Sequence, residues 1–312
     1  MSRLLITGGA GFIGSRLAAQ AVEQGHDVVV LDDLSTGYED NLHGLDVRVV
    51  EGSLLDADLL GNAMGGVDAV VHLAALGSVP RSIKDPLASH AANATGTLHL
   101  LEAVRRGKAP YVVSASSSSV YGLNVELPKR ERSWVRPMSP YAVTKLAAEQ
   151  YTLAYQQSFG LDTLAFRFFN VYGPGQRPGH VYAAVVPVFL DRLLRDLPVP
   201  VHGDGEQSRD FTFVDTVTSV LLDAVSRRVV HPEPVNLAFG TNTSINELVA
   251  TVSTILGRPI AREQLPARPG DVRRSQADNA VLRSLFPGAA PTPLARGLTE
   301  TLTWMRTMHV RG

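Results

Sequence analysis

Three glycines near the start of the chain, each three residues from the next, limit what the chain can fold into. Gly8, Gly11 and Gly14 stand between an apolar run, RLLIT, and a segment with helical spacing, SRLAAQAVEQG. An ordinary flexible turn is one interpretation. The order strand, glycine turn, helix favours a phosphate-binding loop, because the first glycine allows a tight turn, the second lets the backbone approach a pyrophosphate and the third lets the helix pack on the strand. The helix N-terminus would add unpaired N–H groups and a partial positive charge.

The acidic residue that ends the next apolar run supports the phosphate-binding interpretation. The run DVVVLD ends at Asp32. In dinucleotide-binding units, a carboxylate roughly 20 residues beyond the glycine loop accepts hydrogen bonds from the adenosine ribose. A carboxylate at this position also repels the extra phosphate of NADP. The sequence therefore predicts NAD as the cofactor.

Apolar runs alternate with helical segments through the first half of the chain. VRVVEG, DAVVHLAA and PYVVSASS are expected to be further strands, and ATGTLHLLEAVRRG a helix that ends in basic residues and glycine. Strands that are apolar throughout and separated by helices indicate a parallel sheet covered on both faces. We therefore predict an α/β fold with a Rossmann-type doubly wound parallel sheet, and candidate ligand residues just after each strand.

The second half of the chain is less regular. GPGQRPG and RDLPVPVHGDGEQSRDF are rich in glycine or proline and are expected to be loops, whereas SINELVATVSTILG carries the Ser and Glu of a helix capping box. This predicts a smaller α/β substrate-binding domain. We assign residues 1–169 and about 211–238 to the cofactor-binding domain, and about 170–210 and 239–312 to the substrate-binding domain.

Composition excludes several classes of function. The 312 residues carry a formal net charge of -1, which gives no general field for a nucleic-acid backbone or an anionic membrane, so neither is expected as a partner. The absence of cysteine excludes disulfides, thiolate metal sites and a cysteine nucleophile. The histidines show no paired helical spacing, so no metal is predicted, and His72 in an apolar run is interpreted as a core residue. No signal peptide or membrane-spanning run is found, which predicts a cytoplasmic protein.

A tyrosine and a lysine form the candidate catalytic pair. Tyr141 and Lys145 lie four residues apart in SPYAVTKLAAEQY, which places them on one face of a helix. A solvated helix face is the ordinary interpretation of such a pair. Here the hydroxyl-rich SASSSSVYG ends the preceding strand, and an ammonium together with an oxidised nicotinamide would lower the tyrosine pKa from its usual value of about 10. A strand-end serine would then share a substrate hydroxyl with Tyr141.

These motifs together resemble the extended short-chain dehydrogenase/reductase superfamily. TGGAGFIG, HLAA, SSSSVYG, YAVTK, FRFFNVYGPGQ and RDFTFVD stand in the order of that family, and the resemblance covers essentially the whole chain. Within the superfamily the chain is similar to nucleotide-sugar epimerases and dehydratases. The resemblance implies cofactor contacts from the glycine loop, the strand ends and the tyrosine helix: Gly8, Gly11, Phe12, Ile13, Gly14, Asp32, Asp33, Leu34, Ser35, Thr36, Gly37, Ser53, Leu54, Leu73, Ala74, Ala75, Asn93, Tyr141, Lys145 and Phe168.

Three segments, AALGSVPRSI, YAAVVP and GDVRRSQAD, resemble the UDP-N-acetylhexosamine 4-epimerases. In that family the residue five places after the glycine of GD helps to set the width of the sugar pocket. A bulky aromatic residue restricts the pocket to glucose and galactose, and a small residue admits an N-acetyl group. Ser275 occupies this position here. The resemblance therefore implies C4 epimerisation of UDP-GlcNAc and UDP-GalNAc, with UDP-glucose, UDP-galactose and their uronic acids left open.

The serine cluster separates this reaction from related ones. Ser117, four residues before the tyrosine of VYG, matches the family's catalytic hydroxyl. In related 4,6-dehydratases the next two residues are the Asp and Glu that eliminate water, and UDP-glucuronate decarboxylases usually carry glutamate at the second position. Ser118 and Ser119 stand there instead, which disfavours a dehydratase or a UDP-glucuronate decarboxylase. A non-catalytic NAD-binding regulatory protein is a further alternative, but it would have little reason to keep Ser117, Tyr141 and Lys145 together.

The resemblance also implies a mechanism for the three catalytic residues, Ser117, Tyr141 and Lys145. Tyr141, as phenolate, takes the proton of the C4 hydroxyl, while Ser117 hydrogen-bonds the same oxygen and Lys145 holds the nicotinamide ribose. C4 passes a hydride to NAD, and the resulting 4-keto sugar turns about its diphosphate link. Hydride and proton then return to the opposite face of the ring.

Contacts to the rest of the UDP-sugar are implied by the same resemblance. The substrate-binding residues besides Ser117 are Ser78, Arg81 and Gln176 for the sugar, Asn170 for the sugar or diphosphate, Arg209 and Arg268 for the diphosphate, Asp271 for the uridine ribose, and Ser275. Tyr121 of VYG is expected to support its loop. A helix-packed homodimer is also implied. Three positions depart from the family: Arg16 and Asp33 replace the usual His and Asn, and Ser53 replaces the aspartate that contacts the adenine.

Overall fold

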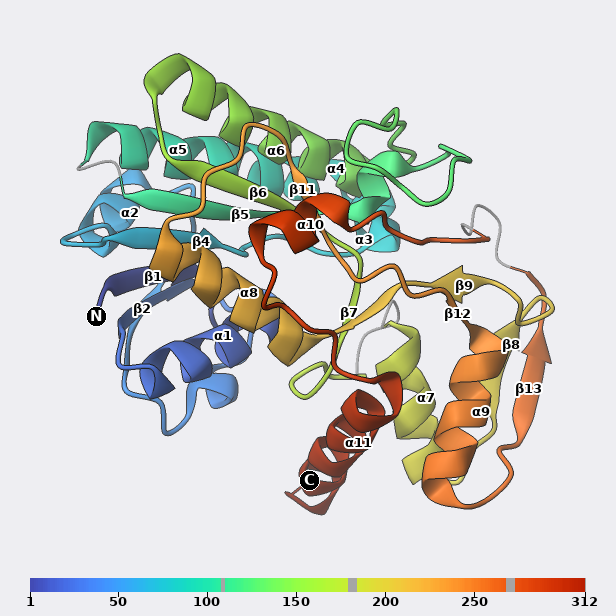
Figure 1. Cartoon of the computed structure of the whole chain (residues 1–312). Coiled ribbons are helices and arrows are strands. Elements are labelled where there is room, and N and C mark those ends of the chain that lie inside the picture. The colour runs from blue at the N-terminus through green and yellow to red at the C-terminus, as the bar shows by residue number, and fades with distance from the viewer. Residues whose placement is uncertain (108–109, 179–183, 268–272, 312) are drawn as a thin grey trace.

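The centre of the chain is a parallel β-sheet (Figure 1). The computed structural model describes residues 1–107, 110–178, 184–267 and 273–311, and within them the sheet has seven strands in the order β11-β6-β5-β4-β1-β2-β3. The strands are β1 (Arg3–Thr7), β2 (Asp27–Asp32), β3 (Val47–Glu51), β4 (Ala69–His72), β5 (Tyr111–Ser117), β6 (Thr163–Phe168) and β11 (Val235–Leu237). Each neighbouring pair runs parallel. The doubly wound parallel sheet predicted from the sequence is confirmed.

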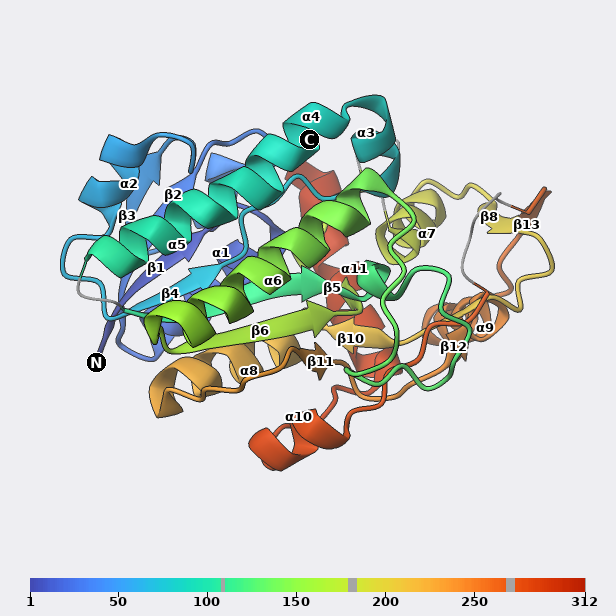
Figure 2. The ribbon, with the colours of Figure 1, turned by 90° about the horizontal axis from the view of Figure 1, so that it is seen from above.

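Helices cover both faces of the sheet. Leu4 and Ile6 of β1 pack in one core with α1 (Phe12–Glu23) and α8 (Val214–Arg227). Leu5 packs in a second core with α2 (Ala57–Ala63), α5 (Gly96–Arg106) and α6 (Pro140–Phe159). Figures 1 and 2 show α5 and α6 on one side of the sheet and α1 and α8 on the other. Because successive strand residues point to opposite faces, a sheet buried on both faces needs continuous apolar runs.

The carboxyl ends of β1 and β4 lie side by side although β2 and β3 come between them in sequence. β1 pairs with β2 on one side and with β4 on the other. The chain therefore leaves β1 and β4 in opposite directions, which opens a crevice at their carboxyl ends, the usual ligand position in such sheets. Short helices follow the strand ends at this edge: η1 (Glu39–Leu42) after β2, α3 (Val79–Lys84) and α4 (Pro86–His90) after β4, and η3 (Ser118–Tyr121) after β5. A π-helical turn, η2 (Ala91–Thr95), leads from α4 into α5.

Segments of the second half form a smaller unit beside this edge (Figure 1). It contains α7 (Val185–Leu194), α9 (Ile245–Leu256), α11 (Leu294–Arg311) and three two-stranded pairs: β7 (Asn170–Tyr172) with β10 (Phe211–Phe213), β8 (Val199–His202) with β13 (Arg262–Leu265), and β9 (Ser208–Arg209) with β12 (Thr243–Ser244). Phe189, Leu248 and Leu298 belong to its separate core. Ser244 and Glu247 form the predicted capping box of α9. None of the described helices combines the length and apolar character needed to cross a membrane.

The second half differs from the sequence prediction in two respects. RDLPVPVHGDGEQSRDF, expected to be a loop, contains β8 and β9, because strands far along the chain supply their hydrogen-bond partners. The helix α10 (Ala280–Leu285) falls in the predicted substrate-binding domain, yet Leu282 and Phe286 pack in the core of the large sheet. Conversely, Phe211 and Phe213 pack in the core of the smaller unit. The division into two domains remains a prediction at its boundaries.

Candidate active site

The glycine loop between β1 and α1 packs against the segment after β4 and leaves no room for side chains at Gly8 and Gly14. Gly8 has a φ of 70°, and a Cβ there would lie 2.7 Å from the Ala74 nitrogen. A Cβ on Gly14 would lie 2.1 Å from the carbonyl oxygen of Gly8. Gly11 is the N-cap of α1, where no side-chain hydrogen bond caps the helix and no acidic residue stands in the first turn. The open N-terminus and the close backbone packing fit the pyrophosphate of a dinucleotide.

Asp32 is held at the end of β2 by two backbone groups. Its Oδ2 accepts from the Ala10 nitrogen at 2.9 Å, and its Oδ1 accepts from the Leu34 nitrogen at 2.9 Å. Burial raises the pKa of Asp32, and these two hydrogen bonds oppose that shift. Since each carboxylate oxygen has two acceptor positions, acceptor capacity remains for a ribose hydroxyl. The neighbouring Asp33 accepts from the nitrogen and hydroxyl of Ser35.

A buried histidine fixes the loop after β4. The Nδ1 of His72 lies 2.7 Å from the Thr7 hydroxyl and its Nε2 lies 2.8 Å from the Thr97 hydroxyl. Thr97 donates to the Asn93 carbonyl, so Nε2 must be the donor and Nδ1 the acceptor. Burial, with a smaller contribution from Lys145, lowers the pKa of His72 to about 3. The prediction of a core histidine is confirmed, with the addition that it supports the strand ends.

Asn93 lies behind the wall of the cleft rather than on its surface. Its Oδ1 accepts from the Leu76 nitrogen at 2.7 Å, and its Nδ2 donates to the Thr144 hydroxyl at 2.9 Å. Thr144 precedes Lys145 on α6. Asn93, expected from the resemblance to contact the cofactor, therefore joins the loop after β4 to the helix that carries the candidate catalytic pair.

One cavity of about 490 Å³ runs from the glycine loop to Tyr141. This volume is in the range of small-molecule and cofactor sites. Twenty of the predicted residues line it: Gly8, Gly11, Phe12, Ile13, Gly14, Asp32, Asp33, Ser35, Thr36, Ser53, Leu54, Leu73, Ala74, Ala75, Arg81, Ser117, Tyr141, Lys145, Phe168 and Gln176. Its described lining also includes residues that the sequence did not indicate: Leu31, Gly52, Leu55, Leu76, Gly77, Ala92, Ala115, Ser116, Phe169 and Val171.

Seven predicted residues are described but are not part of this lining: Leu34, Gly37, Ser78, Asn93, Asn170, Arg209 and Ser275. Arg268 and Asp271, and Tyr182 of the YAAVVP segment, lie outside the described residues. Arg209 of β9 donates to the carbonyl of Ser208, and the Ser275 nitrogen donates to the same carbonyl. Arg209 and Ser275 are thus brought together in the smaller unit.

The candidate catalytic side chains come from α6 and the end of β5. Ser139 caps α6 by accepting from the Ala142 nitrogen, so Tyr141 lies in the first turn of the helix and Lys145 one turn later. Lys145 Nζ donates to the Ala115 carbonyl at 2.9 Å, and burial lowers the pKa of Lys145 to about 8. Burial raises the pKa of Tyr141, against a smaller lowering from its hydrogen bond with Ser117.

The expected lowering of the Tyr141 pKa included the charge of an oxidised nicotinamide, and the raised pKa is that of the protein without this charge. The phenol is removed from water, which disfavours its charged form. The ammonium of Lys145 donates to a carbonyl of β5, and this hydrogen bond leaves its positive charge in the cavity.

A buried ion pair that the sequence analysis did not predict lies next to the candidate catalytic residues. Arg167 of β6 donates two hydrogen bonds to Glu149 of α6, at 2.9 and 2.7 Å. The hydroxyl of Ser116 donates to the same carboxylate at 2.6 Å. The guanidinium of Arg167 also packs on the ring of Tyr121, in agreement with a supporting role for that tyrosine. The spacing of Glu149 could have indicated this residue, because it lies four residues after Lys145 and therefore on the same face of the helix as Tyr141 and Lys145.

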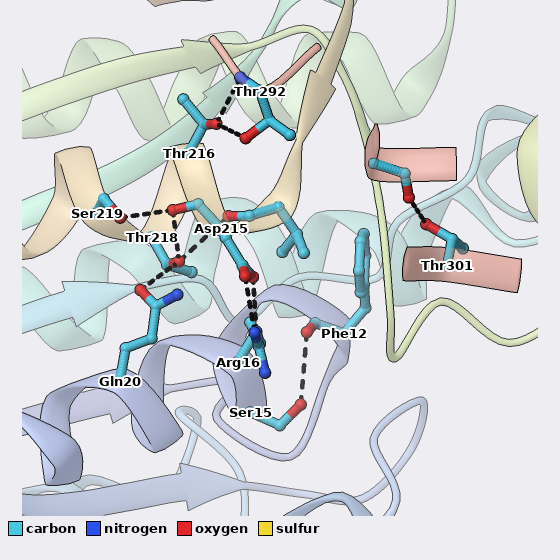
Figure 3. Close-up of polar contacts among 12 residues, drawn as sticks. Phe12, Ser15, Arg16, Gln20, Asp215, Thr216, Thr218, Ser219, Thr292 and Thr301 are labelled. Atoms are coloured by element: carbon cyan, nitrogen blue, oxygen red, sulfur yellow. Dashed lines mark hydrogen bonds and ion pairs between the residues drawn. The ribbon is translucent and has the colours of Figure 1, made fainter. Parts of the chain in front are cut away.

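Two further contacts fasten the glycine loop to distant segments. Figure 3 shows Arg16 of α1 paired through two hydrogen bonds, at 2.6 and 2.7 Å, with Asp215 in the first turn of α8. Arg177, in the loop after β7, packs 3.9 Å from the ring centre of Tyr38 and donates to Asn41. Asn41 in turn donates to the Ala10 carbonyl at 2.9 Å. Both arginines therefore hold the start of α1 and the segment after β2 in place.

Within the described part of the chain, no group of three or more His, Cys, Asp or Glu side chains is arranged to hold a metal ion.

Comparison with known proteins places the chain among sugar-nucleotide enzymes. Residues 4–238 match the model of the NAD dependent epimerase/dehydratase family. A UDP-glucose 4-epimerase of Mycolicibacterium smegmatis is 38% identical over 310 residues, which cover 97% of this chain and 98% of that protein. Relatives named as sugar-nucleotide dehydratases also match.

Solved structures agree over nearly the whole chain. The UDP-N-acetylglucosamine 4-epimerase of Methanobrevibacter ruminantium M1, in complex with UDP-N-acetylmuramic acid, superposes with a TM-score of 0.93 at 34% identity, covering 98% of this chain and 99% of that one. The UDP-glucuronic acid 4-epimerase of Bacillus cereus, in complex with UDP-glucuronic acid and NAD, gives a TM-score of 0.89 at 28% identity, covering 98% and 99%.

Proposed function

Because the chain belongs to the NAD dependent epimerase/dehydratase family, we propose that it epimerises a UDP-hexose at C4 through a transient 4-keto sugar. One observation carries this proposal. Ser117, Tyr141 and Lys145 line the same cavity as the glycine loop, whereas the two positions after Ser117 carry hydroxyls and no carboxyl group.

The residues around the glycine loop fit NAD. Gly8 and Gly14 leave no space for a Cβ, and α1 has an open N-terminus. The carboxylate of Asp32 is oriented by the backbone nitrogens of Ala10 and Leu34. These residues and Lys145 would hold the cofactor. When bound, NAD would supply the acceptor and donor of a hydride at the sugar C4.

The proton chemistry belongs to Tyr141 and Ser117. Tyr141 takes the proton of the C4 hydroxyl and later returns one, while Ser117 hydrogen-bonds the same oxygen. Since burial raises the pKa of Tyr141 in the chain alone, its ionisation requires positive charge in the cavity. Lys145 provides one such charge, and bound oxidised NAD would supply a second.

The residues of the short helix after β5 favour an epimerase over a dehydratase, which would eliminate water from the sugar. Ser118 and Ser119 lie in η3, immediately after Ser117. Neither hydroxyl can serve as the acid and base that remove water across two sugar carbons, because an alcohol neither releases nor takes up a proton readily near neutral pH. The same argument disfavours a decarboxylase.

The proposed substrates are UDP-GlcNAc and UDP-GalNAc, with UDP-glucose and UDP-galactose also accepted. The small side chain of Ser275 supports this proposal, since a small residue at this position admits an N-acetyl group in the UDP-N-acetylhexosamine 4-epimerases that the chain resembles. A homodimer is proposed as well. Its support is an apolar, exposed face of α6, where Val143 is 50% and Tyr151 39% exposed two helical turns apart.

The test is to incubate the purified protein with UDP-GlcNAc or UDP-glucose and to follow the anomeric protons by NMR. We expect the galacto epimer to form without an added reductant. Tyr141→Phe should lower kcat by about 10²–10⁴-fold, because the proton acceptor is lost, and should retain bound NAD. Tyr151→Phe, on the exposed face of the same helix, is the matched control and should retain activity.

Other outcomes identify the alternatives. An unsaturated or deoxy product would indicate a dehydratase, and a pentose product would indicate a decarboxylase. Bound NAD without turnover of any UDP-sugar would indicate a non-catalytic NAD-binding protein.

A further inference from the structure

Side chains from one face of α6 contact the last three residues of β5, over which the helix lies (Figure 2). The helix residues stand four apart and therefore share this face: Tyr141, Lys145 and Glu149. The contacts are hydrogen bonds of Tyr141 with Ser117, of Lys145 with Ala115, and of Glu149 with Ser116. The first two contacts belong to the candidate catalytic residues, whereas the proposed proton chemistry gives the third no role.

The end of β5 depends on contacts from α6 because it lacks a neighbouring strand on one side. Within the described sheet, β4 pairs with β5 only as far as Ser114, whereas β6 accompanies β5 to its end at Ser117. The last three residues of β5 therefore have a hydrogen-bonded strand on the β6 side alone. Ser117 is also the N-cap of η3 and accepts from the Ser119 nitrogen at 3.1 Å, so the chain turns away directly after it.

Glu149 is itself held in one orientation. Arg167 stands directly opposite Ser116 in the pairing of β6 with β5, and both side chains reach the same carboxylate. Arg167 donates to the two oxygens of Glu149 at 2.9 and 2.7 Å, and Ser116 donates to Oε2 at 2.6 Å. The exposed fractions are 1% for Glu149, 3% for Arg167 and 4% for Ser116. A carboxylate this deeply buried cannot turn away without leaving a charge unpaired, so Glu149 is a fixed anchor for Ser116.

We propose that Glu149 and Ser116 are positioning residues, which hold the end of β5 so that the Ser117 hydroxyl stays within hydrogen-bond distance of Tyr141. Glu149 acts through Ser116, and Ser116 acts through the backbone that it shares with Ser117. The proposal rests on the proposed C4 epimerisation, because a reaction through Tyr141 is what requires this alignment. Displacement of a catalytic group by about 1 Å can slow a reaction by about 10²-fold.

Ser116→Ala is the decisive variant, since it removes the hydrogen bond and changes no charge. Glu149→Gln would leave the buried Arg167 without its ionic partner, so its activity would fall for a structural reason as well. For the UDP-sugar that the wild type epimerises, Ser116→Ala should lower kcat by up to about 10²-fold and leave KM unchanged. Ser116→Thr should recover most of this loss, whereas Ser116→Val, which has the same shape without the hydroxyl, should not.

A matched control lies in the same strand. Ser114 is a buried serine two residues before Ser116 and therefore on the same face of β5. Ser114→Ala should keep the kcat of the wild type, because it leaves the contact between Ser116 and Glu149 in place.

The ionisation of Tyr141 provides a readout that a general loss of packing would not move in a set direction. The hydrogen bond with Ser117 lowers the pKa of Tyr141, so weakening this bond should raise that pKa. The acidic limb of kcat/KM against pH should then move to higher pH in Ser116→Ala. The variant alters none of the charged side chains in the described cavity lining, which are Asp32, Asp33, Arg81 and Lys145.

Measurements on the NAD-loaded protein without sugar separate this proposal from the proposed function. With isotope-labelled tyrosine, the NMR signal of Tyr141, assigned by its loss in Tyr141→Phe, should titrate at a higher pH in Ser116→Ala than in the wild type. Calorimetry should give the same NAD affinity for both proteins.

Three results would overturn the positioning role: a wild-type kcat in Ser116→Ala, an unshifted titration of Tyr141, or weaker NAD binding, since Ser116 would then contact the cofactor. If no UDP-sugar is epimerised by the wild type while the titration of Tyr141 still moves in Ser116→Ala, the proposed reaction is wrong and the positioning role stands.

Discussion

At the residue scale, buried polar side chains hold the strand ends that line the cavity. Each of these side chains is hydrogen-bonded to residues of neighbouring elements. His72 joins β1, β4 and α5 through Thr7 and Thr97. Glu149 joins α6 to β6 and to the end of β5 through Arg167 and Ser116. A buried polar group without its partner costs about 1–3 kcal/mol, so these contacts select one arrangement of the strand ends.

The neutral state of His72 makes the stability of the protein dependent on pH. The folded chain holds the pKa of His72 at about 3, against 6.5 ordinarily, so below pH 6.5 the unfolded chain binds a proton that the folded chain does not. His72 therefore contributes full stability above pH 6.5, and this contribution falls by about 1.4 kcal/mol per pH unit toward pH 3. Urea unfolding at pH 7.5, 6.5 and 5.5 should show a flatter pH dependence in His72→Gln than in the wild type.

The exposed His43 provides the control for this measurement. His43→Gln should keep the pH dependence of the wild type. Parallel curves for His72→Gln and the wild type would contradict the buried, uncharged histidine.

The sequence could indicate those site residues that lie close to one another along the chain. Tyr141 and Lys145 share a helix, and Ser117 ends a strand, so local spacing identified them. Glu149 and Arg167 pair only because β6 returns beside β5, and no local pattern contains that pairing.

At the element scale, the junction of β1 with α1 tolerates no side chain at its glycines. A Cβ on Gly14 would lie 2.1 Å from the Gly8 carbonyl oxygen and 2.7 Å from the Gly9 Cα, so α1 would have to move. Gly14→Ala should therefore destabilise the protein by about 1–3 kcal/mol and weaken NAD binding. Chemical unfolding and a titration with NAD check the two effects.

Gly61 in the interior of α2 is the matched control. A Cβ there would have no atom within 4 Å, and alanine has the higher helix propensity. Gly61→Ala should stabilise the protein by about 0.5–1 kcal/mol. If both substitutions shifted the unfolding midpoint in the same direction, the packing described for the glycine loop would be wrong.

Elements were predictable from the sequence where a single local pattern decided them. The strands of the large sheet are continuous apolar runs because both of their faces are buried, and α9 carries its own capping box. β8 and β9 were not predictable, since Pro200 and the surrounding glycines suggest a loop and only the pairing with β13 and β12 makes them strands. The close packing of the loop after β7 on Tyr38 had no signal in the sequence for the same reason.

At the scale of the whole molecule, the cavity lies where the carboxyl edge of the large sheet meets segments of the second half. Val171 and Gln176, from beyond β6, also line the cavity. The parallel sheet and the cofactor-binding edge followed from the order of motifs along the chain. The proposed UDP-binding side was indicated only by the family resemblance, because it is assembled from segments around residues 170, 209 and 275 that approach one another only in the folded chain.

The central claim is that a hydride leaves C4 of a UDP-hexose and returns to the same carbon from the other side. The most direct measurement is NMR of the products formed in ordinary water from UDP-GlcNAc, UDP-glucose and UDP-glucuronate, each deuterated at C4. The account predicts a galacto epimer of at least one of them with the deuterium still at C4. A galacto epimer that carries a solvent proton at C4, or the absence of an epimer from all three, would contradict it.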